Sequence, residues 1–197
     1  MYKKQMKFQR LTCFILLAAS AIVFIYSLGL VTDLYDAFYS TMRNPNNIYN
    51  SKVEGSWIFY EIQPFNSMLT TVSLVLIGCS LLNFITNTHS RRKYYRANYF
   101  SVCLSAVANV AASVWIAINV AKFRTQYITT VDFEALKLYA EEWDTLYIGP
   151  EDTFWFDIGF VICAILIVVA AISIYNLIWK TKLMKEEARL IKEGLEG

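Results

Sequence analysis

The chain has 197 residues, of which 56% are hydrophobic and 17% charged, and its formal net charge is +2. This composition is too apolar for an ordinary soluble domain, and the length fits one compact unit. The small net charge gives no indication of a nucleic-acid partner. We therefore predict an all-α integral membrane protein in which residues 1–197 form a single bundle of four transmembrane helices.

The first predicted span, 11–31, follows a basic N-terminal segment. That segment contains Lys3, Lys4, Lys7 and Arg10 and no acidic residue. A basic start before an apolar run is also typical of a signal peptide, and Ser27-Leu28-Gly29 weakly resembles a cleavage site. Because the uncharged run is longer than a usual signal-peptide core, we expect it to remain as a membrane helix.

Residues 32–63 form the first large loop. Its opening places Leu34, Phe38 and Met42 at helical spacing, which predicts a short amphipathic helix at the membrane interface. The second span is predicted at 64–86, with Pro64 in its first turn, where a missing N–H is tolerated. This span is rich in serine, threonine and asparagine, so we expect other helices to surround it.

Residues 87–96 form a short basic connection to the third span. The cluster consists of Arg91, Arg92, Lys93 and Arg96. Basic side chains beside a membrane helix attract anionic lipid headgroups, so we predict headgroup contact here. A connection this short makes the second and third spans antiparallel neighbours.

The third span, 97–121, carries small or polar residues at every fourth position. They are Ser101, Ser105, Asn109, Ser113 and Ala117. Residues four apart share one side of a helix, so this stripe predicts close packing against another helix, in the same bundle or in a partner. Asn109 is interpreted as forming a hydrogen bond to another helix; the alternative is that Asn109, with Asn83 and Asn119, lines a pore.

The second large loop, 122–157, combines acidic and aromatic residues. The helical spacing of Phe133, Leu136, Ala140 and Trp143 predicts an amphipathic helix ending near Gly149-Pro150. Acids alternate with Phe133, Leu136, Tyr139 and Trp143, and we expect this surface to be covered by the first loop, by lipid or by an extracellular partner. Asp157 is interpreted as a boundary residue at a helix N-terminus. A cation site shared with Glu151 and Asp152 is the alternative.

The fourth span is predicted at 158–179, followed by a mixed-charge tail, 180–197. Basic residues exceed acidic ones by four to none in the N-terminal segment, four to none in 87–96 and five to four in the tail. The loops 32–63 and 122–157 have two against four and three against eight. The positive-inside rule therefore predicts cytoplasmic termini, two extracellular loops and a plasma-membrane location.

Nothing in the sequence has the pattern of a catalytic or metal site. The predicted spans contain no Asp, Glu, Lys, Arg or His, and the one histidine, His89, lies in the basic connection. The cysteines are Cys13, Cys79, Cys103 and Cys163, and each lies in an apolar run, where a small buried side chain is the expected role. We expect no cofactor, no metal and no enzymatic activity.

The topology is similar to that of claudin-like and tetraspanin-like proteins, but the chain lacks the loop motifs of both. The first loop has no Gly-Leu-Trp and no cysteine pair, and the second has no Cys-Cys-Gly. The function that the sequence favours is an accessory or scaffold subunit that binds other membrane proteins or a second copy of itself in the lipid bilayer. The alternatives are a small homo-oligomeric channel or transporter component and, less favoured, a lipid-handling protein.

Overall fold

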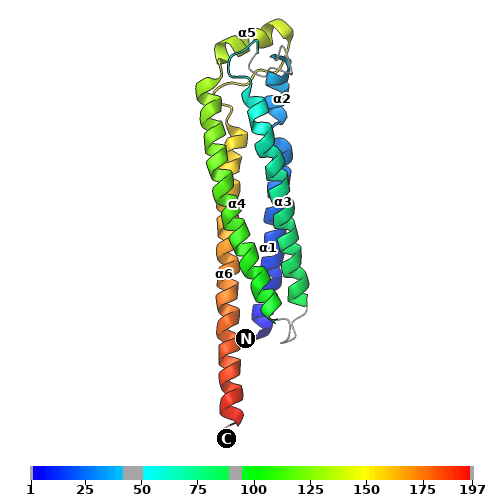
Figure 1. The fold of residues 1–197 in the computed structure, drawn as a ribbon, viewed down its shortest axis with the longest axis vertical. Helices are drawn as coiled ribbons and strands as arrows, with labels where there is room; N and C mark the ends of the chain where they lie inside the picture. Colours follow the sequence, from blue (N-terminus) through cyan, green and yellow to red (C-terminus); the bar gives the residue numbers. More distant parts are fainter. Residues whose placement is uncertain (1, 42–50, 89–94, 196–197) are drawn as a thin grey trace. The chain divides into compact units, whose positions relative to one another are not determined.

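The computed structural model describes residues 2–41, 51–88 and 95–195, and these residues contain helices and no strand (Figure 1). The helices are α1 (Tyr2–Gly29), α2 (Thr32–Phe38), the 3₁₀ turn η1 (Tyr39–Thr41), α3 (Ile58–Thr88), α4 (Tyr95–Thr130), α5 (Phe133–Trp143) and α6 (Phe154–Leu195). Four of them, α1, α3, α4 and α6, are long and apolar enough to cross a membrane. The predicted all-α class with four membrane-spanning helices is confirmed at this level.

Each long helix extends beyond its uncharged run. The sequence predicted Pro64 in the first turn of the second span. Helix α3 begins earlier, at Ile58, so Pro64 lies in its second turn. The helix tolerates it because proline removes only one backbone donor near an end. Helix α6 continues without a break through Leu195 and includes most of the predicted tail. Charged residues do not end a helix; they only mark where apolar surroundings end.

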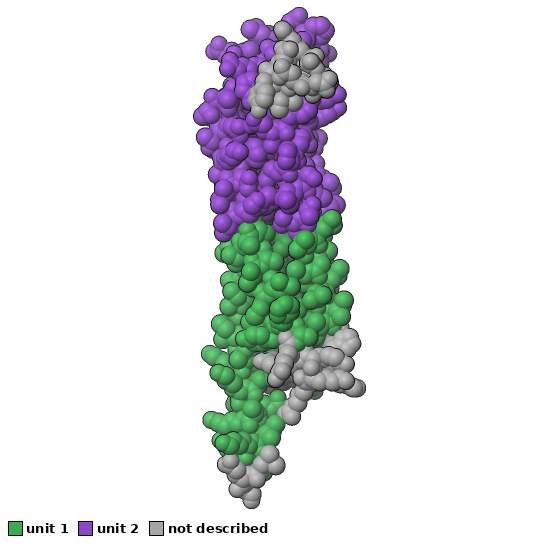
Figure 2. Space-filling model, viewed as in Figure 1, with its two compact units in different colours: residues 1–21, 74–113, 164–197 green, residues 22–73, 114–163 purple. Residues whose placement is uncertain are grey.

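The contacts of the chain divide it into two compact units (Figure 2). Unit 1 comprises residues 1–21, 74–113 and 164–197, and unit 2 comprises residues 22–73 and 114–163. Each unit contains a segment of all four long helices. Unit 2 also contains α2, η1 and α5.

The interiors of the two units differ in polarity. Of the twenty buried polar or charged side chains in the described residues, fifteen lie in unit 1. The apolar part of the unit 1 core includes Leu16, Leu76 and Leu166, each at most 1% exposed. The core of unit 2 is mainly aliphatic and aromatic, with Ile62, Ile116 and other large side chains fully buried.

Helix α5 ends at Trp143, six residues before the predicted end at Gly149. Asp144 adopts a left-handed backbone conformation (φ 49°), which stops the helix earlier than glycine and proline would. The start of α5 is capped by Asp132, whose carboxylate accepts the Ala135 N–H at 2.9 Å.

The short helix α2 covers the first part of the segment predicted to be an interfacial helix. Leu34 and Phe38 are 5% and 0% exposed, so they pack inside unit 2 and do not form an open apolar face. Met42, the third residue of that pattern, lies outside the described residues.

A glycine joins the two loop regions of unit 2. Gly55 has φ +79°, and a Cβ there would lie 2.2 Å from the Thr130 carbonyl oxygen. Beside it, the Asp132 N–H donates to the Glu54 carbonyl oxygen at 3.0 Å. Only glycine allows this backbone to approach the end of α4 so closely.

Candidate functional site

The most unusual group in unit 1 is a buried cluster of one lysine and four amides, here called the Lys180 cluster. It contains Gln5 and Gln9 of α1, Asn98 of α4, and Asn176 and Lys180 of α6. Lys180 is 7% exposed, and each of the four amide side chains is at most 2% exposed. Buried charges and amides need hydrogen-bond partners, because an unpaired polar group away from water is costly.

Each amide in the Lys180 cluster is bonded to a neighbouring helix or to the lysine. Gln5 donates through Nε2 to Asn176 Oδ1 at 3.0 Å and to Gln9 Oε1 at 3.1 Å. Gln9 donates to Asn98 Oδ1 at 2.7 Å. The Lys180 ammonium donates to Gln9 Oε1 at 3.4 Å and to Asn98 Oδ1. The cluster therefore connects α1, α4 and α6 through side chains alone.

A second group, the Asn83 cluster, continues the network between α3 and α4. It consists of Asn83, Thr86, Ser101 and Ser105. Asn98 donates to Thr86 Oγ1 at 3.1 Å, Ser101 donates to Asn83 Oδ1, and Asn83 donates to Ser105 Oγ at 2.7 Å. The two clusters thus form one hydrogen-bonded network that includes all four long helices.

Three buried amide oxygens of unit 1 have no hydrogen-bond donor within the part of the chain that the structure describes. They are Gln5 Oε1, Asn87 Oδ1 and Asn109 Oδ1, and their residues are at most 3% exposed. The interior of unit 1 therefore has more acceptors than its donors satisfy.

The stripe predicted on the third span lies largely inside the chain. Ser101, Ser105, Asn109 and Ser113 are 0–3% exposed within unit 1, and Ala117 is half-buried in unit 2. Asn109 donates to the Ser105 carbonyl oxygen of its own helix at 2.7 Å, so its amide N–H does not link two helices. Four of the five small residues are used by the chain's own packing.

The predicted headgroup site can be located only in part. Arg91, Arg92 and Lys93 lie outside the described residues, as does His89, and Arg96 lies in the first turn of α4. The cysteines Cys13 and Cys163 are buried, while Cys79 and Cys103 are half-buried, and all four are free thiols.

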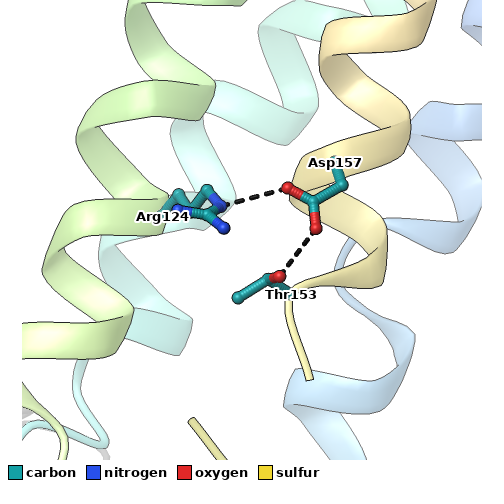
Figure 3. Close-up of polar contacts among 3 residues, drawn as sticks. All are labelled: Arg124, Thr153 and Asp157. Atoms are coloured by element: carbon teal, nitrogen blue, oxygen red, sulfur yellow. Dashed lines mark hydrogen bonds and ion pairs between the residues drawn. The ribbon is translucent and has the colours of Figure 1, made fainter. Parts of the chain in front are cut away.

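In unit 2, Asp157 forms an ion pair and not a cluster of acids (Figure 3). The Arg124 Nε of α4 lies 3.1 Å from Asp157 Oδ1, and Thr153 Oγ1 donates to Oδ2 at 2.7 Å. Both charged side chains are partly exposed, at 37% and 54%. The described residues contain no group of three or more His, Cys, Asp or Glu placed to hold a metal ion.

The four residues predicted as an extracellular surface divide between core and surface. Leu136 and Tyr139 are buried, Phe133 is half-buried and Trp143 is 56% exposed. The Tyr139 hydroxyl donates to the Ser40 carbonyl oxygen at 2.8 Å, and the Lys52 ammonium lies 4.9 Å and 4.6 Å from the Tyr139 and Trp143 rings. The apolar residue most exposed on α5 is Leu138, at 68%.

The Lys180 cluster was missed by the sequence analysis, which ended the fourth span at residue 179. A signal was present: Gln5 and Gln9 are four residues apart, as are Asn176 and Lys180, so each pair shares one helix side. Two polar pairs on different spans favour a buried layer over two solvated ends.

The comparisons do not add a family: no protein-family model matches the chain, and no curated protein or solved structure matches it.

Proposed function

We propose that the protein is a non-catalytic plasma-membrane protein with cytoplasmic termini that serves as an accessory or scaffold subunit. The orientation rests on the excess of lysine and arginine in the N-terminal segment and in 87–96. The binding role rests on apolar side chains exposed on an otherwise acidic loop, outside the uncharged spans. Exposed apolar groups in such a setting are typical of protein interaction sites.

Helix α5 and the segment after it carry the observation that supports this function best. Leu138, Trp143 and Leu146 are 68%, 56% and 46% exposed, although the surrounding residues include Glu141, Glu142 and Asp144. Burial of these three side chains by a partner would remove apolar surface from water. Four residues of the predicted stripe on α4 are already buried, so a partner in the membrane would contact the other side of that helix, which exposes Phe100, Val107 and Ile118.

Purification in a mild detergent tests the accessory role. We expect a second protein in fixed stoichiometry with the chain. Leu138→Ser should weaken that complex, whereas Leu190→Ser, an exposed leucine on α6, should leave it intact. A chain that purifies alone, or equal loss with both variants, would contradict this proposal.

The second candidate is a small homo-oligomeric channel or transporter component, and the polar interior of unit 1 favours it. A continuous network of amides, hydroxyls and one ammonium is also what a polar pathway requires. A stable homo-oligomer that conducts ions in liposomes, with conductance altered by Asn109→Leu, would establish this function in place of the accessory role.

A further inference from the structure

Unit 2 contains a partly enclosed cavity of about 320 Å³ beside the start of α6. Its apolar lining includes Leu30, Leu34, Ile148 and Phe156, which are 1–8% exposed. The rings of Tyr147 and Trp155 also line it. A mainly apolar cavity of a few hundred Å³ is typical of a small-molecule site.

Asp152 is the one charged residue in the lining of this cavity. Its Oδ2 accepts the Gly149 N–H at 2.7 Å, and its own N–H donates to the Gly149 carbonyl oxygen at 3.1 Å. The same carbonyl oxygen accepts the Tyr127 hydroxyl at 2.6 Å. The carboxylate is therefore held by a short turn that is itself fixed to α4.

The charge of Asp152 is not neutralised by an ion pair with a basic side chain of the described residues. This separates it from Asp157, which Arg124 neutralises (Figure 3). The wider surroundings increase the attraction for cations, because the loop 122–157 has three basic and eight acidic residues. An anionic ligand would be repelled here.

We propose that this cavity binds an organic ammonium ion with an apolar body. The carboxylate of Asp152 takes the ammonium group, and the rings of Tyr147 and Trp155 add cation–π attraction. The apolar body then fills the space lined by Leu34, Ile148 and their neighbours. A neutral ligand of the same shape gains the apolar contacts but lacks the charge-assisted hydrogen bond to the exposed carboxylate.

Titration of the purified full-length chain in a neutral detergent tests this proposal. The probe is 2-phenylethylammonium, and its neutral counterpart is 2-phenylethanol, with binding followed by calorimetry. We expect saturable binding of the ammonium ion and about three- to tenfold weaker binding of the alcohol, since the ion pair and the cation–π attraction are lost. Equal affinity for the two ligands would overturn the proposal.

Two variants locate the site. Asp152→Asn keeps an oxygen that can accept the Gly149 N–H, and it should weaken binding by about three- to tenfold. Glu142→Gln removes the same charge from α5, outside the cavity lining, and should change the affinity less than about twofold. Leu34→Phe, which adds side-chain volume to the lining, should also weaken binding. Equal effects of Asp152→Asn and Glu142→Gln, or full binding by Leu34→Phe, would contradict the assignment.

Two kinds of ligand carry such an ammonium group: a free amine and the ethanolamine headgroup of a lipid. Repeating the titration in nanodiscs of phosphatidylglycerol, with and without phosphatidylethanolamine, distinguishes them. Competition by phosphatidylethanolamine assigns the site to the lipid, and unchanged affinity assigns it to a free amine. Absence of binding in all three environments would overturn the ammonium site while leaving the accessory function untouched.

Discussion

Lys180 places a positive charge in the interior of unit 1, and the amides around it make this tolerable. The side-chain oxygens of Gln9 and Asn98 accept hydrogen bonds from the Lys180 ammonium, and they also accept hydrogen bonds from the amide groups of Gln5 and Gln9. One change in the cluster therefore affects several bonds, since buried polar networks act together. The lysine is part of the packing of α1, α4 and α6, and not a solvated residue of the tail.

Replacing Lys180 by methionine keeps the aliphatic part of the side chain and removes the donor. We expect Lys180→Met to lower the free energy of unfolding in detergent by about 1–3 kcal/mol, because buried amide oxygens lose a charged donor. Lys182→Met, on the exposed side of α6, should change it by no more than about 0.5 kcal/mol. Equal shifts in the two variants would show that Lys180 is solvated.

The double variant Lys180→Met/Asn98→Leu separates this network from a general loss of charge. Asn98→Leu alone deprives the buried Lys180 ammonium of an acceptor, and Lys180→Met removes that ammonium, so the double variant should lose less stability than the two single variants combined. Additive losses would argue against a direct bond between the two side chains.

Asn83 provides a test of the second cluster. Asn83→Leu removes the bonds to Ser101 and Ser105, and it should cost about 0.6–2 kcal/mol of stability, the range for hydrogen bonds between membrane helices. Asn119→Leu is the matched control, because Asn119 donates to the Trp115 carbonyl oxygen of its own helix. Thermal unfolding in the same detergent compares them; a larger loss for Asn119→Leu would reverse the ranking.

For individual residues, the sequence predicted which side chains would be packed better than it predicted which residue each of them would contact. The spacing of four residues between Ser101, Ser105 and Asn109 indicated a packed side of a helix, and these residues are buried within the chain. The partner of each side chain depends on how four helices are rotated about their axes, which local spacing does not determine. Lys180 was placed in the tail 180–197 because a charged residue ends an uncharged run, and the burial of its side chain depends on the same helix rotations.

At the scale of elements, the long helices follow from their uncharged runs, and their ends depend on local backbone chemistry. The backbone of a helix satisfies its own hydrogen bonds, so α4 and α6 continue beyond their uncharged runs, through Thr130 and Leu195. The early end of α5 at Asp144 was not predictable, because aspartate adopts the left-handed conformation only in some contexts. Uncharged runs in the sequence therefore locate the membrane spans but underestimate the length of the helices.

Two glycines in different backbone settings test this account of the loop elements. Gly55→Ala should destabilise the protein by about 1–2 kcal/mol or more, because φ is positive and the new Cβ would collide with Thr130. Gly78→Ala lies inside α3, where a new Cβ meets no atom within 4 Å, and it should be neutral or stabilising by up to about 1 kcal/mol. Thermal unfolding in detergent measures both; the opposite order would contradict the close approach at Gly55.

For the molecule as a whole, the two units differ in the kinds of side chain and of site that they contain. Unit 1 holds the polar network, and unit 2 holds the loop elements, the Arg124–Asp157 pair and the cavity at Asp152. The sequence predicts one bundle over residues 1–197, because the length fits one compact unit. It did not indicate that polar residues inside the spans concentrate in one unit, since that depends on which side of each helix is buried.

The functions proposed for the chain depend on four membrane spans with both ends of the chain in the cytoplasm. Single cysteines in a variant with all four native cysteines replaced by alanine test this topology with a membrane-impermeant maleimide. We expect Glu54→Cys and Glu142→Cys to be labelled in intact cells, and Lys4→Cys and Lys192→Cys to be labelled only after permeabilisation. Labelling of Lys4→Cys or Lys192→Cys in intact cells, or protection of Glu142→Cys, would contradict the four-span topology and the functions proposed from it.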